Sequence, residues 1–185
     1  VDKRQIHDGI ATREEIASFS VNSHFHGALN PNAQFRKAIT LDTVLKSGPT
    51  ATPLGMFDCA PISDGAAGLV LCPLEDAKKY TDSYVKVSAV AQASDTLALF
   101  QRPDITTYQA TVEAAKRAYE AAGITAKDID VAEVHDTYTV TGIMALQDLG
   151  FYKRGEAGKA VLNEECHFDS GNICLLYTSD AADDK

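Results

Sequence analysis

Val131-Ala132-Glu133-Val134-His135-Asp136 is the stretch of sequence that decides the fold. Its first four residues, which include two valines, predict a short strand that ends in two polar side chains. A short turn of helix at Ala126–Ile129 is predicted before it, and a helix over about Thr139–Leu149 after it. The strand therefore delivers His135 and Asp136 at its C-terminal end, where layered α/β folds place their ligand crevice.

Helices are predicted further out along the chain. The clearest covers Thr106–Ala122, where apolar residues recur at four-three spacing and Gly123 is the expected stop. Thr12-Arg13-Glu14-Glu15 is a capping box, which predicts a helix over about Arg13–His24.

Short elements and a loop fill the interval before residue 80. A loop is expected over Ala28–Phe35, because Asn30-Pro31-Asn32 interrupts the helical pattern. A short helix is expected within Ile39–Leu45, capped by Thr40 or Asp42, and another over Leu74–Lys79.

Two apolar runs predict further strands. Ala66–Cys72 is almost wholly apolar, as in a strand buried on both faces, and Val85–Ala91 is rich in valine. The polar link Lys78–Ser83 between them is the predicted domain boundary. Helices that alternate with strands in this order indicate a layered α/β fold.

Composition excludes several classes of function. A formal net charge of −9 argues against nucleic acid or an anionic membrane as the partner. No apolar run reaches the ~18–20 residues of a membrane span. The four cysteines form no C-x-x-C pair, which disfavours a zinc ribbon or a disulfide framework and predicts reduced thiols in the cytoplasm.

Both ends of the chain suggest an internal fragment of a longer protein. The chain begins with Val1 rather than Met, and residues 174–185 resemble the translation of a sequencing-library adapter. We therefore expect residues 174–185 to be a non-native tail and exclude them from predictions of the fold.

His135 allows two interpretations from the residues alone. An imidazole at a strand end can donate a hydrogen bond to a developing oxyanion, but it can equally be a half-buried structural histidine at a strand–helix junction. Asp136 can support such a site or simply cap the following helix.

Several collinear blocks resemble one family. Glu133-Val134-His135-Asp136-Thr137-Tyr138-Thr139 with Leu146-Gln147-Asp148-Leu149-Gly150-Phe151 is similar to blocks of the thiolase superfamily, specifically sterol-carrier-protein-type and archaeal acetyl-CoA acetyltransferases. Ser63–Ala67, Thr111–Ile124 and His24–Phe35 match the same family in the same order. The resemblance covers Val1 to about Gly171.

The resemblance implies a thiolase-like layered α/β/α fold that is incomplete. Residues 1–83 would close the N-terminal half, including a loop region over the substrate, and residues 84–173 would open the C-terminal half. The implied activity is acyl transfer between CoA thioesters, by reversible Claisen condensation or thiolysis through a cysteine acyl-enzyme. CoA thioesters would be substrates, and no cofactor is expected.

The resemblance also assigns roles to residues. His135 would help to form the oxyanion hole, with Asp136 and Tyr138 in support. Thr137 and Tyr138 stand where relatives have Cys and Phe, which puts ligand preference in doubt. Ala60 stands where relatives tend to have a Ser facing the CoA arm.

The segment His24–Phe35 would cover the substrate tunnel, which makes His24, His26 and Asn30 weak candidates for substrate or CoA binding. A metal interpretation of the H-x-H pair His24 and His26 is disfavoured, because a helix end separates the two rings and no third ligand stands nearby.

The residues that thiolase chemistry needs are not found in the chain. The nucleophilic Cys and the G-H-P and C-x-G motifs would lie outside it, and Cys59, Cys72 and Cys166 are interpreted as structural thiols. The chain alone is therefore expected to be inactive. The family implies a homodimer and a small OB-fold acyl-CoA-binding partner.

Two alternatives remain open. A non-catalytic thiolase-fold protein that binds acyl-CoA or lipid is compatible with the Ala60 and Thr137 departures. A nucleotide-binding α/β domain is disfavoured, because no Gly-rich phosphate loop follows a strand.

Overall fold

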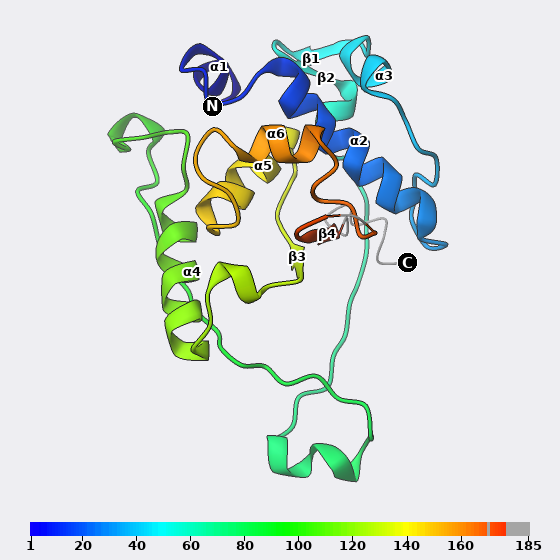
Figure 1. The fold of residues 1–185 in the computed structure, drawn as a ribbon, viewed down its shortest axis with the longest axis vertical. Coiled ribbons are helices and arrows are strands. Elements are labelled where there is room, and N and C mark those ends of the chain that lie inside the picture. Colours follow the sequence, from blue (N-terminus) through cyan, green and yellow to red (C-terminus); the bar gives the residue numbers. More distant parts are fainter. Residues whose placement is uncertain (170, 177–185) are drawn as a thin grey trace.

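The structure is a computed structural model that describes residues 1–169 and 171–176. Helices make up most of its body, and an extended hairpin-like excursion leaves it (Figure 1). The α-helices are α1 (Asp2–His7), α2 (Arg13–Leu29), α3 (Leu41–Leu45), α4 (Gln109–Ala122), α5 (Thr139–Asp148) and α6 (Ala157–Leu162). The 3-10 turns are η1 (Met56–Asp58), η2 (Leu74–Lys79), η3 (Leu99–Gln101) and η4 (Ala126–Asp128). The strands are β1 (Pro49–Ala51), β2 (Leu54–Gly55), β3 (Val131–Glu133) and β4 (Cys174–Leu176).

The predicted capping box starts α2. The Thr12 hydroxyl accepts a hydrogen bond from the Glu15 amide at 3.2 Å, and the Glu15 carboxylate accepts one from the Thr12 amide at 2.9 Å. The helix runs to Leu29, so the predicted end at His24 was wrong by more than a turn. The stop is Asn30-Pro31, because a proline disfavours helical backbone in the residue before it.

The core lies where α2 meets α5 and α6. One buried cluster joins residues of these helices to the segment after α6: Phe19, Ile143, Leu146, Ala157, Val161, Cys166, Ile173 and Leu175. A second cluster lies toward the N-terminus: Ala11, Ile16, Leu54, Val140 and Met144. The helices α2 and α5 both contribute to the two clusters, so together they form the centre of the body.

The strand predicted over Val131–Val134 is confirmed as β3. It pairs in parallel with β4, with Val131 opposite Cys174 and Glu133 opposite Leu176. Cys174–Leu176, which we expected to begin a non-native tail, thus takes part in the fold. The rest of that expected tail, residues 177–185, lies outside the described residues.

The predicted helix Thr106–Ala122 starts three residues later, at Gln109. The Asp148 carboxylate accounts for the delay, because it accepts hydrogen bonds from the Thr107 hydroxyl at 2.6 Å and the Tyr108 amide at 2.7 Å. These bonds hold the chain before α4 against the end of α5. The predicted stop is confirmed, since Gly123 ends α4 in the left-handed conformation at φ 72°.

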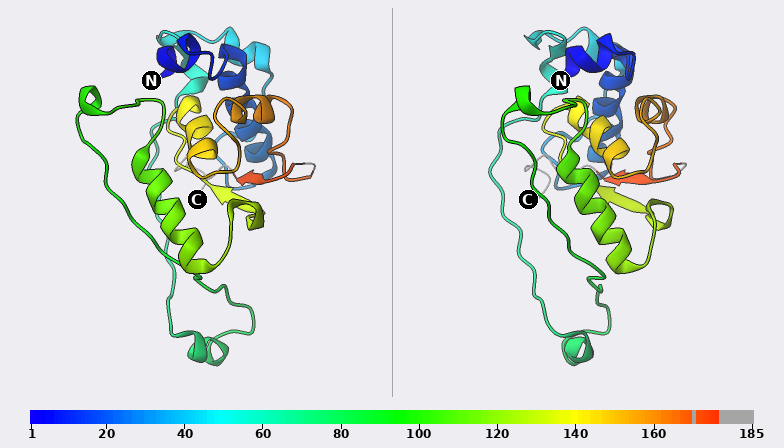
Figure 2. Two further views of the ribbon diagram at one scale, coloured as in Figure 1. Left: turned by 60° about the vertical axis from the view of Figure 1, so that its left-hand side comes forward. Right: turned by 90° about the vertical axis from the view of Figure 1, so that its left-hand side faces the viewer.

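The strands predicted at Ala66–Cys72 and Val85–Ala91 are not formed. Both runs are extended and largely exposed, and they leave the body on the way to and from η2 (Figure 2). Their apolar pattern is that of a strand, but a strand also needs a hydrogen-bonding neighbour. Within the described residues neither run has one. The short helix predicted over Leu74–Lys79 is formed as the 3-10 helix η2.

Candidate functional site

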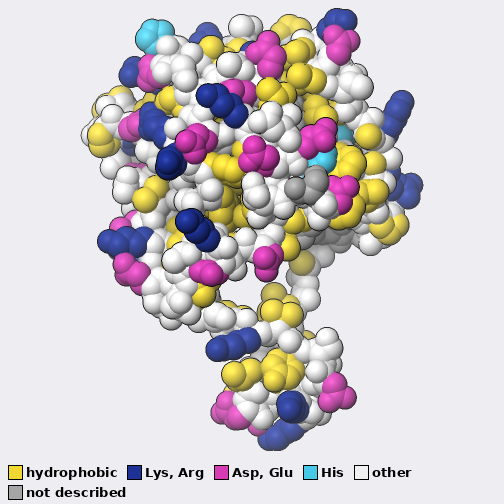
Figure 3. Space-filling view, in the orientation of Figure 1, with side chains coloured by type: hydrophobic (Ala, Val, Ile, Leu, Met, Phe, Trp, Pro, Cys, Tyr) yellow, Lys and Arg dark blue, Asp and Glu magenta, His cyan; other side chains and the backbone are white. Residues whose placement is uncertain are grey.

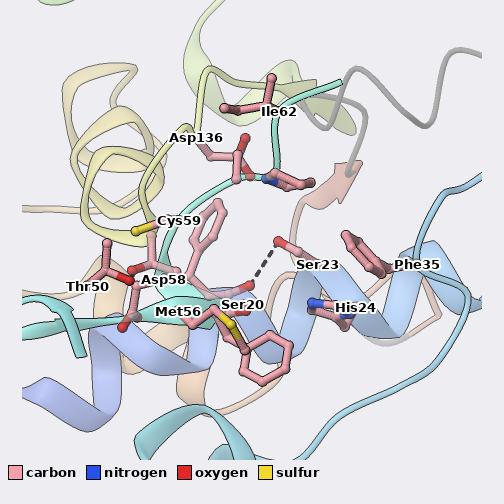
Figure 4. Close-up of a pocket in the computed structure, with 15 residues that line it drawn as sticks. Ser20, Ser23, His24, Phe35, Thr50, Met56, Asp58, Cys59, Ile62 and Asp136 are labelled. Atoms are coloured by element: carbon pink, nitrogen blue, oxygen red, sulfur yellow. Dashed lines mark hydrogen bonds between the residues drawn. The ribbon is translucent and has the colours of Figure 1, made fainter. Parts of the chain in front are cut away.

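The candidate site is a pocket of about 630 Å³ between α2, η1 and the start of α5. Figure 4 shows its walls converging from these elements and from Phe35 in the loop after α2. Most of the lining is apolar, with Phe19, Met56, Phe57 and Ile62 among the larger side chains. A few polar groups interrupt this apolar lining, as is usual for a small-molecule site.

One face of α2 forms the floor of the pocket. Phe19, Ser20, Ser23 and His24 line it, because residues one, four and five positions apart share a helix face. The Ser23 hydroxyl donates to the Phe19 carbonyl at 2.9 Å, so it is tied to its own helix (Figure 4). Behind Phe19 lies Gly142 of α5, where any added Cβ would overlap the phenyl ring.

Asp58 connects the walls of the pocket. Its carboxylate is fully buried and accepts hydrogen bonds from the Arg13 guanidinium, the Gly55 amide at 2.7 Å and the Thr139 hydroxyl at 3.0 Å. Arg13 belongs to the first turn of α2, whereas Thr139 begins α5. One carboxylate thus joins α2, η1 and α5 around the same pocket.

The backbone completes this junction. The Ala60 amide donates to the Thr137 carbonyl at 2.9 Å, and Cys59 and Tyr138 form an isolated antiparallel bridge. The segment after η1 therefore lies directly against the segment that leads from β3 into α5. This places Ala60 in the pocket wall.

Cys59 brings a thiol into the pocket. Its sulfur lies 3.7 Å from the Gly55 carbonyl oxygen, to which the thiol donates. Burial raises the pKa of the Cys59 thiol, and the neighbouring Asp58 carboxylate adds to the rise. The group is therefore held as the thiol, which is the poorly nucleophilic form.

The His135 ring is placed next to the pocket rather than in its lining. Asp136 lines the pocket and is 9% exposed, whereas His135 is exposed and its Nε2 lies 2.6 Å from the Thr137 hydroxyl. Consecutive residues of extended backbone point to opposite sides, so only one of the two enters the pocket. The Tyr138 side chain is exposed, and Tyr138 is the N-cap residue of α5.

The three weak candidates for substrate or CoA binding, His24, His26 and Asn30, do not lie together in the structure. His24 lines the pocket between the rings of Phe35 and Phe57, at centroid distances of 6.0 and 5.8 Å. His26 faces away from the pocket, and its ring centroid lies 5.7 Å from that of the His167 ring. Asn30 ends α2 and accepts a hydrogen bond from the Asn32 amide at 2.9 Å, outside the pocket lining.

Two features are absent from residues 1–169 and 171–176. No group of three or more His, Cys, Asp or Glu side chains is placed to hold a metal ion there. No helix in that part of the chain is long and apolar enough to cross a membrane.

Comparison with known proteins assigns the family. Residues 91–176 match the family described as "Thiolase C-terminal domain-like". An acetyl-CoA acetyltransferase of Methanothermobacter thermautotrophicus is 48% identical over 158 residues, which are 85% of this chain and 41% of that protein. The chain belongs to the thiolase superfamily.

Two further comparisons agree with this assignment. Sterol carrier protein 2 of Oryctolagus cuniculus is 33% identical over 153 residues, covering 80% of this chain and 28% of that protein. A solved chain of the "Ltp2-ChsH2(DUF35) aldolase" superposes with a TM-score of 0.84 at 24% identity, covering 98% of this chain and 47% of that one. The expected thiolase-like α/β fold is confirmed, and the chain spans less than half of each of these proteins.

Sequence reasoning missed the residue that organises this thiolase-superfamily pocket. The sequence alone assigns no role to Asp58, because its partners lie 45 and 81 residues away in the sequence. The available signal was an acidic residue inside the apolar run Leu54–Pro61, since a buried carboxylate needs a cation or several donors.

Proposed function

We propose that this chain is part of a thiolase-type acyltransferase that acts on CoA thioesters. The observation that carries the proposal is the 48% identity to an acetyl-CoA acetyltransferase over 158 residues. The pocket supports it, because a largely apolar cavity with a few polar groups suits an acyl chain and the pantetheine arm of CoA.

The proposed reaction joins two acyl-CoA molecules into a 3-ketoacyl-CoA and free CoA, or runs in reverse. In the forward direction an acyl group is first held as a thioester on an enzyme cysteine, which releases CoA. The α-carbon of the second thioester loses a proton and attacks the acyl carbonyl, and the cysteine sulfur leaves. Negative charge develops on a thioester oxygen, and donors placed there lower the barrier.

His135 is proposed as one of these donors. Its contact with the Thr137 hydroxyl supports the role, because a hydrogen bond to one ring nitrogen fixes the orientation and the tautomer of an imidazole. Where Thr137 donates to Nε2, the ring proton resides on Nδ1, which is then the atom that can donate to an oxyanion. Asp136, which enters the pocket from the next position, is proposed as a support of the same site.

The acyl-carrying cysteine is proposed to lie outside these 185 residues. Cys59 is the cysteine in the pocket lining, and its thiol has a raised pKa, which disfavours the thiolate that acyl transfer requires. The chain alone is therefore proposed to bind ligands of the CoA type without turning them over. A homodimer and an OB-fold partner are part of the same proposal, and the solved aldolase, whose name joins Ltp2 to ChsH2(DUF35), supports the partner.

The test is thiolysis by the full-length protein that contains this chain. Acetoacetyl-CoA and CoA should give acetyl-CoA, and His135→Ala should reduce kcat/KM by about 10²–10³ with unfolding unchanged. His7→Ala is the matched control, because His7 is an exposed histidine of α1. Equal turnover in the two variants would remove His135 from the mechanism, and absence of thiolysis in the parent would refute the activity.

A non-catalytic acyl-CoA-binding protein is the second candidate. The Ala60 and Thr137 departures favour it, because both stand where relatives have other residues near the proposed ligand. Isothermal titration with acetyl-CoA, combined with a test for the acyl-enzyme, distinguishes the two functions. Saturable binding by a full-length parent that forms no acyl-enzyme, as read by intact mass, would support the binding protein.

A further inference from the structure

A second cavity, of about 370 Å³, lies between α1, η3 with its C-cap residue, and the turn that joins α5 to α6. Among the described residues, none lines both this cavity and the candidate site. Three arginines line it, one from each of these segments: Arg4, Arg102 and Arg154. We call this cavity the arginine pocket. The proposed acyl transfer makes no use of it.

Positive charge exceeds negative charge in the lining of the arginine pocket. Its acidic residues are Asp8 and Asp104, so three guanidinium groups face two carboxylates. The chain as a whole has a formal net charge of −9, and Figure 3 shows basic and acidic side chains intermixed on the face that it draws. A local excess of positive charge on an acidic protein attracts anionic ligands.

Arg102 is the most buried of the three arginines, with its side chain 15% exposed. Its Nε donates to the Thr96 carbonyl at 2.7 Å. Its Nη1 lies 3.8 Å from Oδ2 of Asp95, which is beyond hydrogen-bond distance. A guanidinium so far removed from water needs acceptors for its Nη groups, and an anion in the pocket would supply them.

The other two arginines are held in place by acidic side chains. Nε of Arg4 lies 2.5 Å from Oδ2 of Asp8. Arg154 donates from Nη1 to Oδ2 of Asp104 at 2.6 Å and from Nη2 to the Thr106 hydroxyl at 2.5 Å. Side chains that are oriented before a ligand arrives lose less entropy when they bind it.

The turn around Thr106 makes this arrangement rigid. The Thr106 amide and hydroxyl donate to Oδ1 of Asp104 at 2.8 and 2.5 Å, and the Gln5 side chain of α1 donates to the Thr106 carbonyl at 3.3 Å. The Thr106 hydroxyl contributes most to lowering the pKa of Asp104 to about 2, and the Thr106 amide and Arg154 add to the effect. Asp104 is therefore ionised at neutral pH and keeps Arg154 in position.

Apolar side chains form the remaining part of the lining. Leu99 and Phe100 of η3 are 54% and 88% exposed, and Pro103 and Ile105 lie beside them in the pocket wall. Apolar surface next to a cationic wall suits a ligand that carries its anionic group on a larger body, such as a nucleoside.

We propose that the arginine pocket binds a phosphate group. Arginines from three segments can surround a tetrahedral dianion, whereas a planar carboxylate is matched by a single guanidinium fork. The phosphate belongs either to the nucleotide end of CoA or to a separate phosphorylated ligand, because both present the same group. The proposal does not depend on the proposed acyl transfer.

The test is isothermal titration of the full-length protein that contains this chain, in a buffer without phosphate. The probes are inorganic phosphate and adenosine 3′,5′-bisphosphate, with succinate as the carboxylate for comparison. Both phosphates should bind saturably, and added salt should weaken their binding because it screens the arginines. The absence of saturable binding of either phosphate below about 10 mM would overturn the proposal. Succinate that binds as tightly as phosphate would overturn it as well.

Arg102→Gln assigns the binding to the arginine pocket. This variant should raise the Kd of both phosphates at least about tenfold, because it removes charged hydrogen-bond donors. Arg117→Gln is the matched control, since it removes the same charge from an exposed pair of α4 outside the pocket lining, and it should leave the Kd unchanged. Equal Kd values for the two variants would contradict the assignment.

Asp8→Asn tests the same pocket in the opposite direction. The change removes a carboxylate from the lining and releases Arg4 from its ion pair, so phosphate should bind several-fold more tightly. Asp42→Asn is the matched control, because Asp42 pairs with Lys46 on the surface of α3. If the arginines served only structural ion pairs, Asp8→Asn would bind phosphate no better than Asp42→Asn, and the proposal would fail.

Competition identifies the source of the phosphate group. If it is that of CoA, acetyl-CoA should displace adenosine 3′,5′-bisphosphate, and Arg102→Gln should weaken both ligands alike. If it belongs to a separate ligand, saturating acetyl-CoA should leave the Kd of the bisphosphate unchanged. Either result supports the phosphate site, and neither measurement needs turnover. A full-length protein without thiolysis activity would therefore refute the proposed acyl transfer but not the arginine pocket.

Discussion

The Arg13 guanidinium and the Asp58 carboxylate meet at two points, with Nη1 to Oδ1 at 3.1 Å and Nη2 to Oδ2 at 2.5 Å. The Asp58 side chain is 0% exposed and that of Arg13 is 22% exposed. This ion pair links the first turn of α2 to the pocket wall, and the Thr139 hydroxyl adds the link to α5.

Removal of Arg13 should destabilise the fold strongly. In Arg13→Ala the carboxylate of Asp58 stays buried without its cation, which typically costs about 3–5 kcal/mol. The free energy of unfolding, measured by urea denaturation at pH 7, should fall by that amount. Thr139→Val should cost less, about 1–2 kcal/mol, because it removes a single hydrogen bond to the same carboxylate.

Arg117→Ala is the matched control for that measurement. Arg117 pairs with Glu113 on the surface of α4, where both side chains are more than 40% exposed. Exposed pairs of this kind contribute at most about 1 kcal/mol. Similar losses for Arg13→Ala and Arg117→Ala would show that the Asp58 junction does not hold the pocket walls together.

Gly142→Ala should destabilise the fold by pushing Phe19 toward the pocket. The new methyl group would overlap the ring of Phe19, which is 2% exposed and has little room to move except toward the cavity. We expect a loss of about 1–3 kcal/mol, although alanine is the better helix former. Gly68→Ala is the control, since nothing lies within 4 Å of its added Cβ. Equal melting temperatures for the two variants would contradict the close contact between Gly142 and Phe19.

Local patterns predicted the helices well, because their signals are local. The Thr12 capping box, the stripe of α4 and the stop at Gly123 each depend on residues within a few positions. The start of α4 was missed because Asp148, far along the chain, binds the residues before it. Propensity cannot anticipate such a partner.

The strands and the site show the limit of the same reasoning. Ala66–Cys72 has the composition of a buried strand, yet burial and pairing depend on polypeptide that no local pattern reveals. The His135-Asp136 pair was located correctly after β3, but the alternation of extended backbone decides which side chain enters the pocket. The Asp58 junction brings together residues from three distant segments and could not be read from any one of them.

The stability of the fold should depend on pH through His26. Burial lowers the pKa of His26, and the nearby His167 ring lowers it further, whereas the Asp169 carboxylate opposes the shift. The unfolded chain therefore binds a proton at His26 at higher pH than the folded chain does. Stability should be complete above about pH 6.5 and fall as the pH drops below it.

Urea midpoints at pH 7.5 and pH 5.5 check this dependence. His26→Gln should flatten the difference between the two midpoints, even though its overall stability is lower. His7→Gln should keep the difference, because the His7 side chain is 81% exposed. An unchanged difference in His26→Gln would assign the pH dependence to other groups.

The cysteines should react with iodoacetamide in an order set by exposure and pKa. Cys72 is exposed and should react first, followed by Cys59, whose pKa is raised by burial in the pocket wall. Cys166 is 0% exposed and burial raises its pKa to about 11, so it should react last. Peptide mass spectrometry after timed labelling at pH 8 gives the three rates.

Ligand protection then links Cys59 to the proposed function. If the pocket takes the pantetheine arm of CoA, acetyl-CoA should slow the labelling of Cys59 at least fivefold and leave the rate of Cys72 unchanged. Cys72 serves as the internal control, because it lies in the exposed run Ala66–Cys72, outside the pocket lining. Equal slowing at both cysteines would indicate a general effect of the ligand, and no slowing at Cys59 would place the CoA arm elsewhere. The thiol beside Asp58 thus reports whether the pocket that this carboxylate organises is the one that receives the substrate.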